Sequence, residues 1–234
     1  MGVFKFKQFS VCDDRATMKV GTDAVLLGAW ANVSEAKTIL DIGSGSGVIS
    51  LMMAQRSNED AKIDAVELLC EDSQQASENV ANAPWQDKIS IFNTSIQDFN
   101  PGIKYDCIIC NPPFFSKSLL PPAESRRTSR HDTTLTHNDL LEVSIRLLAP
   151  DGGLSVILPF AEGEAFILKA LSRKLFMNRF TRFFTRPGKL QERSLLEFRF
   201  TRGELQEDSL VHYQSDNQWT DEYCRLTKGF YLAQ

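Results

Sequence analysis

The chain has 234 residues and a formal net charge of −4, and 42% of its residues are hydrophobic. This length accommodates one α/β domain with a full core but is too short for two ordinary domains. Its apolar runs are far shorter than a membrane span and the amino terminus lacks the apolar core of a signal peptide, so we expect a cytoplasmic protein without membrane contact.

The first predicted element is a helix near residues 22–31, where Thr22 begins an apolar-rich stretch. Threonine is a good helix N-cap residue, so we expect Thr22 to cap this helix. Thr22 could also face a bound ligand. Both roles stay open at this point.

A glycine loop follows the first apolar strand, which we place near residues 39–42. Gly43, Gly45 and Gly47 permit a tight turn with positive φ angles and let a ligand approach the backbone closely. Val48 replaces the third glycine of a dinucleotide fingerprint, which disfavours NAD and FAD. The Gly-Lys-Ser/Thr of a nucleotide-triphosphate loop is also missing.

Glu67 ends the next predicted strand, near residues 62–67, and lies twenty residues after Gly47. A carboxylate at this spacing accepts hydrogen bonds from ribose hydroxyls. The glycine loop and Glu67 together predict a site for a cofactor that contains ribose.

The most informative motif is Asn111-Pro112-Pro113-Phe114, which directly follows an apolar strand near residues 105–110. The Asn111 side-chain oxygen and the Pro112 carbonyl are acceptors, and the prolines fix the backbone and remove competing N–H donors. Phe114 offers a face on which a base can stack. These groups suit a planar target with an NH2 group, although Asn-Pro is also an ordinary turn signal.

Cys107 and Cys110 form a C-x-x-C pair inside the same strand. No second pair and no histidine cluster accompany them in the sequence, so we expect buried packing rather than zinc or redox chemistry. The sequence therefore predicts no metal.

Beyond this motif, residues 116–134 are rich in Pro, Ser and Arg and predict a long functional loop. Thr136 and Asp139 resemble a capping box that opens a helix, and the turn residues 150–153 close it. Residues 178–200 predict a β-hairpin.

Positive charge is concentrated in residues 165–202, where ten basic residues stand against Glu192 and Glu197, a net charge of +8. The rest of the chain therefore carries −12 within the overall −4. A concentration of this size in an acidic protein favours a surface for a polyanion over a merely solvated face. The candidates for nucleic-acid contact are Arg182, Arg186 and Lys189.

After residue 37, short apolar strands alternate with helical stretches, which is typical of a parallel sheet covered on both faces. We therefore predict a single α/β domain with a Rossmann-like fold: a seven-stranded, mostly parallel sheet with one antiparallel strand, and helices on both faces. Residues 1–37 form an initial segment, 38–202 the core and 203–234 a carboxyl-terminal extension. Strands are expected near 39–42, 62–67, 88–92, 105–110, 154–158, 177–184 and 194–201, and helices near 22–31, 47–56, 71–82, 137–148 and 161–175.

The glycine loop and the Asn-Pro-Pro-Phe tetrapeptide together resemble the S-adenosylmethionine-dependent amino-methyltransferases. The usual tyrosine of the tetrapeptide is Phe114 here, a change that preserves stacking but removes any role for a hydroxyl. Three further segments carry recognisable patterns: residues 14–30 (DRATMKVGTDAVLLGAW), residues 129–137 with Ser129-Arg130-His131-Asp132 and Leu135-Thr136-His137, and residues 226–232 (LTKGFYL). These segments are similar to the bacterial tRNA1(Val) (adenine(37)-N6)-methyltransferase family, so the resemblance covers nearly the whole chain.

This resemblance implies a class I methyltransferase fold, S-adenosyl-L-methionine as cofactor and a tRNA substrate, with adenine 37 beside the anticodon as the target. It also implies roles for particular residues. Asn111 and Pro112 would accept hydrogen bonds from the target amine, with Pro113 as rigid support and Phe114 as stacking platform. Gly43, Ser44, Gly45 and Gly47 would line the methionine end of the cofactor, Glu67 would bind the ribose, Leu68 and Phe99 would pack on the adenine, and Asp98 would accept from its amino group.

Besides Thr22, three residues keep two possible roles. Asp41 either faces the ammonium of the cofactor or holds the loop backbone. Arg130 and His131 either clamp a backbone phosphate beside the target base or are solvated loop residues.

Other functions remain open. Protein-glutamine methyltransferases share the tetrapeptide, but they typically carry a helical domain before the glycine loop, and only 37 residues precede the corresponding strand here. Other RNA or DNA amino-methyltransferases share it too. A non-catalytic RNA-binding module would need neither the three glycines nor Glu67 and Asn111. No obligate protein partner is expected.

Overall fold

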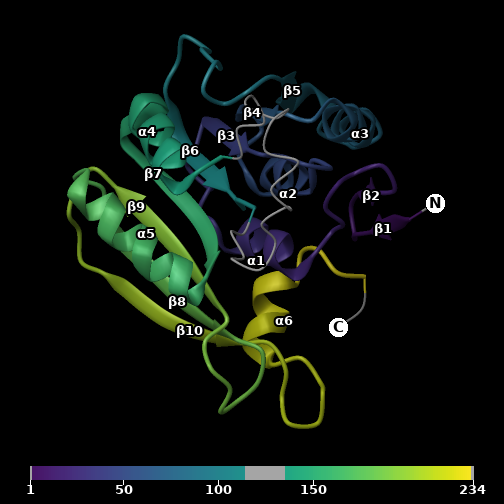
Figure 1. Cartoon of the computed structure of the whole chain (residues 1–234). Coiled ribbons are helices and arrows are strands. Elements are labelled where there is room, and N and C mark those ends of the chain that lie inside the picture. The colour runs from purple at the N-terminus through teal and green to yellow at the C-terminus, as the bar shows by residue number, and fades with distance from the viewer. Residues whose placement is uncertain (1, 114–134, 233–234) are drawn as a thin grey trace, which may run out of the picture.

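The computed structural model describes residues 2–113 and 135–232. Its centre is an eight-stranded sheet in the order β10-β8-β9-β7-β6-β3-β4-β5 (Figure 1). A separate two-stranded hairpin lies near the amino terminus. The strands are β1 (Val3–Lys5), β2 (Ser10–Cys12), β3 (Thr38–Ile42), β4 (Lys62–Glu67), β5 (Ile89–Asn93), β6 (Tyr105–Cys110), β7 (Leu148–Pro159), β8 (Phe176–Phe184), β9 (Arg193–Arg199) and β10 (Gln206–Val211).

The sheet is parallel except for β9, which runs antiparallel to both of its neighbours, β7 and β8. The predicted hairpin is therefore confirmed, and so is the prediction of one antiparallel strand. All seven predicted strands are present, and β10 adds an eighth, parallel to β8 at the edge of the sheet. Strand β10 was not predicted, because most of its residues are polar and exposed and show no apolar pattern.

Helices cover both faces of the sheet, as predicted (Figure 1). Alternate strand residues face opposite sides, so Ile39 of β3 joins the core cluster that contains α1, α2 and α3, whereas Leu40 joins the cluster that contains α4 and α5. Because both faces are buried, the central strands are apolar along nearly their whole length. The helices are α1 (Thr22–Trp30), α2 (Val48–Arg56), α3 (Cys70–Ala81), the short 3-10 helix η1 (Gln86–Lys88), α4 (His137–Leu147), α5 (Phe160–Ser172) and α6 (Asp221–Thr227).

The predicted turn between α4 and β7 is wrong. The capping box of Thr136 and Asp139 does open α4, but β7 begins directly after the helix, and residues 150–153 belong to the strand. A register shift between β6 and β7 accommodates them. Glycine is required there, because a Cβ at Gly152 would lie 2.6 Å from the Tyr105 carbonyl oxygen. Close strand approach, rather than a turn, thus explains this glycine.

Residues 6–7 and residues 229–231 meet beside α2. Phe6 and Tyr231 form an isolated antiparallel bridge, and the Lys7 backbone N–H donates to the Phe230 carbonyl at 2.7 Å. The Gln55 side chain of α2 donates to the Gly229 carbonyl at 2.9 Å. These contacts attach the carboxyl-terminal segment to the same face of the sheet that α1 and α2 cover.

One edge of the sheet collects the predicted functional residues. The strands β3, β4, β6, β7 and β8 all end at this edge, which we call the carboxyl edge, and the antiparallel β9 begins there. Open α/β sheets bind their ligands at such an edge. The opposite edge, where β8 begins and β9 ends, is called the amino edge below.

Candidate functional site

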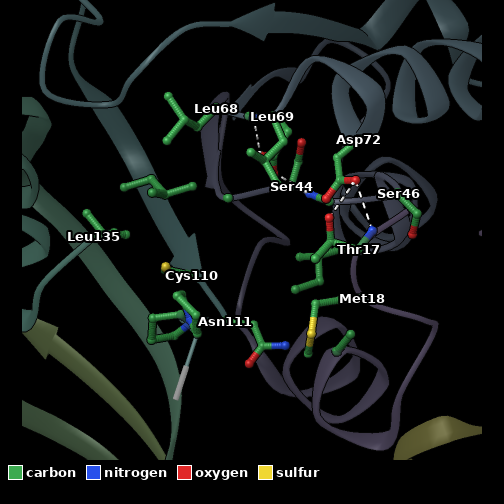
Figure 2. Close-up of a pocket in the computed structure, with 18 of the residues that line it drawn as sticks. Thr17, Met18, Ser44, Ser46, Leu68, Leu69, Asp72, Cys110, Asn111 and Leu135 are labelled. Atoms are coloured by element: carbon green, nitrogen blue, oxygen red, sulfur yellow. Dashed lines mark hydrogen bonds between the residues drawn. The ribbon is translucent and has the colours of Figure 1, made fainter. Parts of the chain in front are cut away.

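A cavity of about 650 Å³ opens at the carboxyl edge (Figure 2). Segments from very different parts of the sequence form its walls: residues 17–24, the glycine loop after β3, the end of β4, residues 94–97, and the end of β6. The predicted residues that line it are Thr22, Gly43, Ser44, Gly45, Glu67, Leu68, Asn111, Pro112 and Pro113. The fold therefore brings the glycine loop, the acid and most of the tetrapeptide to one site.

The glycine loop has the geometry that its residues predict. Gly43, Gly45 and Gly47 have φ angles of +72°, +54° and +81°, which other residues rarely adopt. A Cβ at Gly43 or Gly45 would meet nothing within 4 Å, so the backbone there faces open space. Gly47 caps α2 and packs against Ala76 instead. Gly43 and Gly45 are thus suited to contact a ligand, and Gly47 shapes the turn.

Glu67 is almost fully buried at the end of β4, and its carboxylate is held by backbone donors. The Gly45 N–H donates to Oε2 at 2.9 Å, and the Leu69 N–H donates to Oε1 at 2.8 Å. Burial raises the pKa of the Glu67 carboxyl, and these two hydrogen bonds oppose the rise. Glu67 therefore lines the cavity and also ties the glycine loop to β4.

Asp41 lies on β3, two residues before the glycine loop, and does not line the cavity. The Ser50 hydroxyl donates to its Oδ2 at 2.5 Å, while Oδ1 has no partner among the described residues. Complete burial raises the pKa of Asp41 to about 7, although the bond from Ser50 lowers it. Asp41 thus contacts α2 in this structure.

Thr22 is the first residue of α1, and Gly21 occupies the N-cap position. The prediction that Thr22 caps the helix is therefore wrong. Its side chain is free of that role, and the residue lines the cavity.

The wall after β5 differs from the prediction in detail. Gln97 and Ile96 line the cavity, but Asp98 and Phe99 do not. The Asp98 carboxylate accepts from the Ser95 hydroxyl at 2.6 Å, and Phe99 packs against Phe92 with ring centroids 5.1 Å apart. Leu68 stands exposed on the wall formed by the end of β4.

Arg146 of α4 holds this wall in place, a role that the sequence did not reveal. Its guanidinium donates to the Phe99 carbonyl at 2.8 Å, to the Ile96 carbonyl at 3.1 Å and to the Gln97 carbonyl at 3.3 Å. The signal was not visible in the sequence because about 50 residues separate Arg146 from its partners.

Asn111 sits directly after β6 with its side chain in the cavity (Figure 2). Its Oδ1 is buried and has no hydrogen-bond partner among the described residues. An unpaired buried acceptor is costly, because the group has lost its water without gaining a donor. This oxygen is therefore suited to a ligand that brings its own N–H. Pro112 and Pro113 complete this wall, and Phe114 lies outside the described residues.

The topology divides the predicted basic cluster between two edges of the sheet. Arg186 and Lys189 lie in the turn between β8 and β9, at the carboxyl edge, together with Arg193 at the start of β9. Arg173, Lys174 and Arg202 lie at the amino edge. A nine-residue strand separates the two groups by about 25–30 Å. Only the first group shares an edge with Asn111.

Several of these cations already have protein partners. Arg182 pairs with Glu207 and lies over the Phe180 ring, and Arg186 donates to the Asn217 side chain. Lys189 is exposed. Arg130 and His131 lie outside the described residues, so their two possible roles stay predictions.

Part of the cavity wall was not predicted from the sequence. Thr17, Met18, Lys19, Asp72 and Arg193 all line it. The first three belong to a segment that carried a family resemblance but no assigned role. Arg193 was counted among the surface cations, yet its Nε donates to Asp23 Oδ2 at 2.9 Å at the cavity wall.

Among the described residues, no group of three or more His, Cys, Asp or Glu side chains could hold a metal ion. None of the helices in this part of the chain has the length and apolar character that crossing a bilayer requires. Cys107 and Cys110 are buried, and burial raises the pKa of both thiols.

Comparison with known proteins gives consistent results. Residues 15–178 match the family model of the methyltransferase small domain. The tRNA1(Val) (adenine(37)-N6)-methyltransferase of Phocaeicola vulgatus is 44% identical over 98% of this chain and 97% of its own length. The protein of the same name from Salmonella arizonae is 42% identical over 98% of this chain and 94% of its own.

A solved structure shares the fold at low sequence identity. The predicted O-methyltransferase from Agrobacterium tumefaciens superposes with a TM-score of 0.71 at 20% identity, covering 89% of this chain and 96% of the other.

Proposed function

Because this chain belongs to the tRNA1(Val) (adenine(37)-N6)-methyltransferase family, we propose that it transfers a methyl group from S-adenosyl-L-methionine to N6 of adenine 37 in that tRNA. Adenine 37 is the base on the 3′ side of the anticodon. A cytoplasmic location gives the enzyme access to this substrate.

The observation that carries the proposal is the buried Oδ1 of Asn111, which no described residue satisfies with a hydrogen bond, in a cavity that also contains the glycine loop. An exocyclic amine donates two hydrogen bonds, and the Asn111 oxygen and the Pro112 carbonyl are two acceptors at adjacent positions. The site therefore matches an NH2 target beside a cofactor.

The cavity fits the cofactor. Gly43 and Gly45 expose backbone to open space, Glu67 supplies a carboxylate at the end of β4, and Leu68 and Ile96 supply apolar walls. S-adenosylmethionine, when bound, supplies an electrophilic methyl group on a sulfonium. We propose that Gly43, Ser44 and Gly45 hold its methionine part, Glu67 its ribose, and Leu68, Ile96 and Gln97 its adenine.

The adenine amine is a poor nucleophile because its lone pair is delocalised into the ring. Acceptors that hold the amine hydrogens out of the ring plane localise that lone pair on nitrogen. Asn111 and Pro112 would do this work by position and electrostatics, so no general base with a tuned pKa is required. With the amine held in this way by Asn111 and Pro112, its nitrogen would accept the methyl group that the bound cofactor supplies and would lose one proton to solvent.

The target base lies in an anticodon loop, where it is unpaired, so turning it into the cavity costs less than extraction from a duplex. Lys189 and Arg186 share the carboxyl edge with the cavity and supply positive charge where RNA phosphates would approach. Arg182, which lies within β8 two residues before the strand ends, is the third proposed contact.

A labelled-methyl transfer assay on separated tRNA, ribosomal RNA and protein fractions tests the function. We expect label in tRNA, released as N6-methyladenosine on digestion. Label in protein as methylated glutamine, with none in RNA, would assign the chain to glutamine methylation instead. Cofactor binding by calorimetry without transfer to any fraction would favour a binding module.

A further inference from the structure

Residues 12–20 form a strap that crosses from the amino-terminal hairpin to α1 along the cavity wall. Polar side chains of α3 hold it from one side. The Asn79 amide donates to the Cys12 carbonyl at 2.8 Å and accepts from the Cys12 N–H at 2.9 Å. The same amide donates to the Ser46 carbonyl of the glycine loop at 2.8 Å. The strap is thus tied both to a helix and to the cofactor loop.

The backbone on both sides of Met18 is fixed. The Thr17 N–H and hydroxyl donate to Asp72 Oδ1 at 2.9 and 3.1 Å, as the dashed lines in Figure 2 show. On the other side, the Val20 N–H donates to Asp13 Oδ2 at 2.9 Å. Asp72 and Asp13 are both buried acids, so these anchors belong to the protein interior rather than to a solvated loop.

Met18 itself contrasts with these anchored neighbours, because the residue is 63% exposed. It lines the same cavity as Asn111, and in Figure 2 both side chains project into one end of that cavity. Leu68 and Leu69 lie at the other end of the view. A large apolar side chain on an anchored backbone, which the described residues leave exposed at a cavity, is suited to pack on a ligand. Thioethers pack well on aromatic rings.

We propose that Met18 packs against the face of the target adenine and holds the base beside Asn111, which makes Met18 a positioning residue for the substrate. The proposal rests on the proposed function, since it assigns the Asn111 end of the cavity to the base and the Leu68 end to the adenosine of the cofactor. The strap then has a defined task. Its hydrogen bonds to α3 fix the position of one wall of the base site.

Two substitutions of Met18 test this. Met18→Ala removes the contact and should lower kcat/KM for tRNA about three- to tenfold, which lies within the range that sulfur–aromatic contacts imply. Met18→Leu keeps an apolar side chain of similar size and should retain most of the activity. Affinity for S-adenosylhomocysteine, measured by calorimetry, should be unchanged in both variants, and so should the melting temperature.

Leu190→Ala is the matched control. Leu190 is 89% exposed at the same edge of the sheet but does not line the cavity, so its loss should leave cofactor affinity and the intrinsic transfer step unchanged. Single-turnover transfer at saturating tRNA isolates that step, and Met18→Ala should slow it relative to Leu190→Ala.

Unchanged kcat/KM in Met18→Ala, with an active wild-type enzyme, would overturn the role of Met18 alone. If Met18→Ala bound S-adenosylhomocysteine more weakly but kept the wild-type kcat/KM for tRNA, the role of Met18 would also be overturned, because Met18 would then contact the cofactor instead of the base. A wild-type enzyme that transfers no methyl group to RNA would overturn the proposed function and this inference with it.

Discussion

The backbone N–H of Gly45 donates to the carboxylate of Glu67 at 2.9 Å, so the acid at the end of β4 is bonded directly to the glycine loop after β3. The glycine loop and Glu67, which sequence spacing assigns to one cofactor, therefore hold each other in position. Any substitution of Glu67 changes both a ligand contact and the position of the loop.

Glu67→Ala should weaken the binding of S-adenosylhomocysteine by about 1.5–3 kcal/mol, as expected for the loss of hydrogen bonds to a charged group. Glu67→Gln should have a smaller effect, because the amide keeps one acceptor for the two backbone donors. Isothermal titration calorimetry measures both. Asp64→Ala is the control, since Asp64 lies on the same strand, outside the cavity, and accepts from the Tyr105 hydroxyl. If all three variants lost the same affinity for S-adenosylhomocysteine, Glu67 would have no specific role in cofactor binding.

Asn111→Ala should reduce the single-turnover rate of methyl transfer at least about 100-fold, comparable to the removal of one preorganised polar contact in other active sites. Cofactor affinity should stay near the wild-type value, because the expected partner of Asn111 is the target amine. Rapid-quench transfer kinetics and calorimetry separate the two effects. A fully active Asn111→Ala enzyme would contradict the proposed role of Asn111 as acceptor for the target amine.

Asp41 gives the protein a specific pH dependence of stability. Its pKa is about 7 in the fold, against an ordinary value of 3.8, so the folded state keeps a proton that the unfolded state releases. Raising the pH from about 4 to about 7 therefore disfavours folding through this group, and the loss levels off above pH 7. Asp41→Asn removes this contribution.

Chemical denaturation of both proteins between pH 5 and pH 8 tests that sign. As the pH rises to 7, the free energy of unfolding of the wild type should fall relative to that of Asp41→Asn. Parallel pH profiles would show that Asp41 does not hold a proton in the folded state.

Replacing Arg182, Arg186 and Lys189 together with glutamine should weaken tRNA binding and make its salt dependence shallower by up to about three phosphate contacts. Arg182 should contribute least, because it is paired with Glu207. The matched control replaces Arg173, Lys174 and Arg202 with glutamine, and these substitutions remove the same amount of positive charge from the amino edge. Fluorescence anisotropy over a salt series distinguishes them. Equal effects would mean that net charge alone, rather than position, governs binding.

Some of the site was predictable because local patterns specify it. Glycines at alternate positions after an apolar strand require positive φ, and an Asn followed by two prolines ends a strand in only a few ways. Parallel strands then bring Gly43, Glu67 and Asn111 to one edge without further information. The seven strands of the core follow from the same apolar patterns.

Other parts depended on contacts between distant residues. Asp98 was assigned to the cofactor on resemblance alone, but it is bonded to Ser95, and Gln97 takes the place at the wall. Arg146 and the strap residue Thr17 act through partners that the sequence does not show, and the place of Met18 on the cavity wall depends on the same fold. Strand β10 forms because β8 offers a free edge, although its own residues are mostly polar.

The most direct test of the central claim is site mapping of the product by nuclease digestion and mass spectrometry, with unmodified tRNA1(Val) transcript as substrate. The proposed function predicts one N6-methyladenosine, at position 37, and no product from a transcript in which adenine 37 is replaced by guanine. N6-methyladenosine at another position, or undiminished transfer to the substituted transcript, would contradict it.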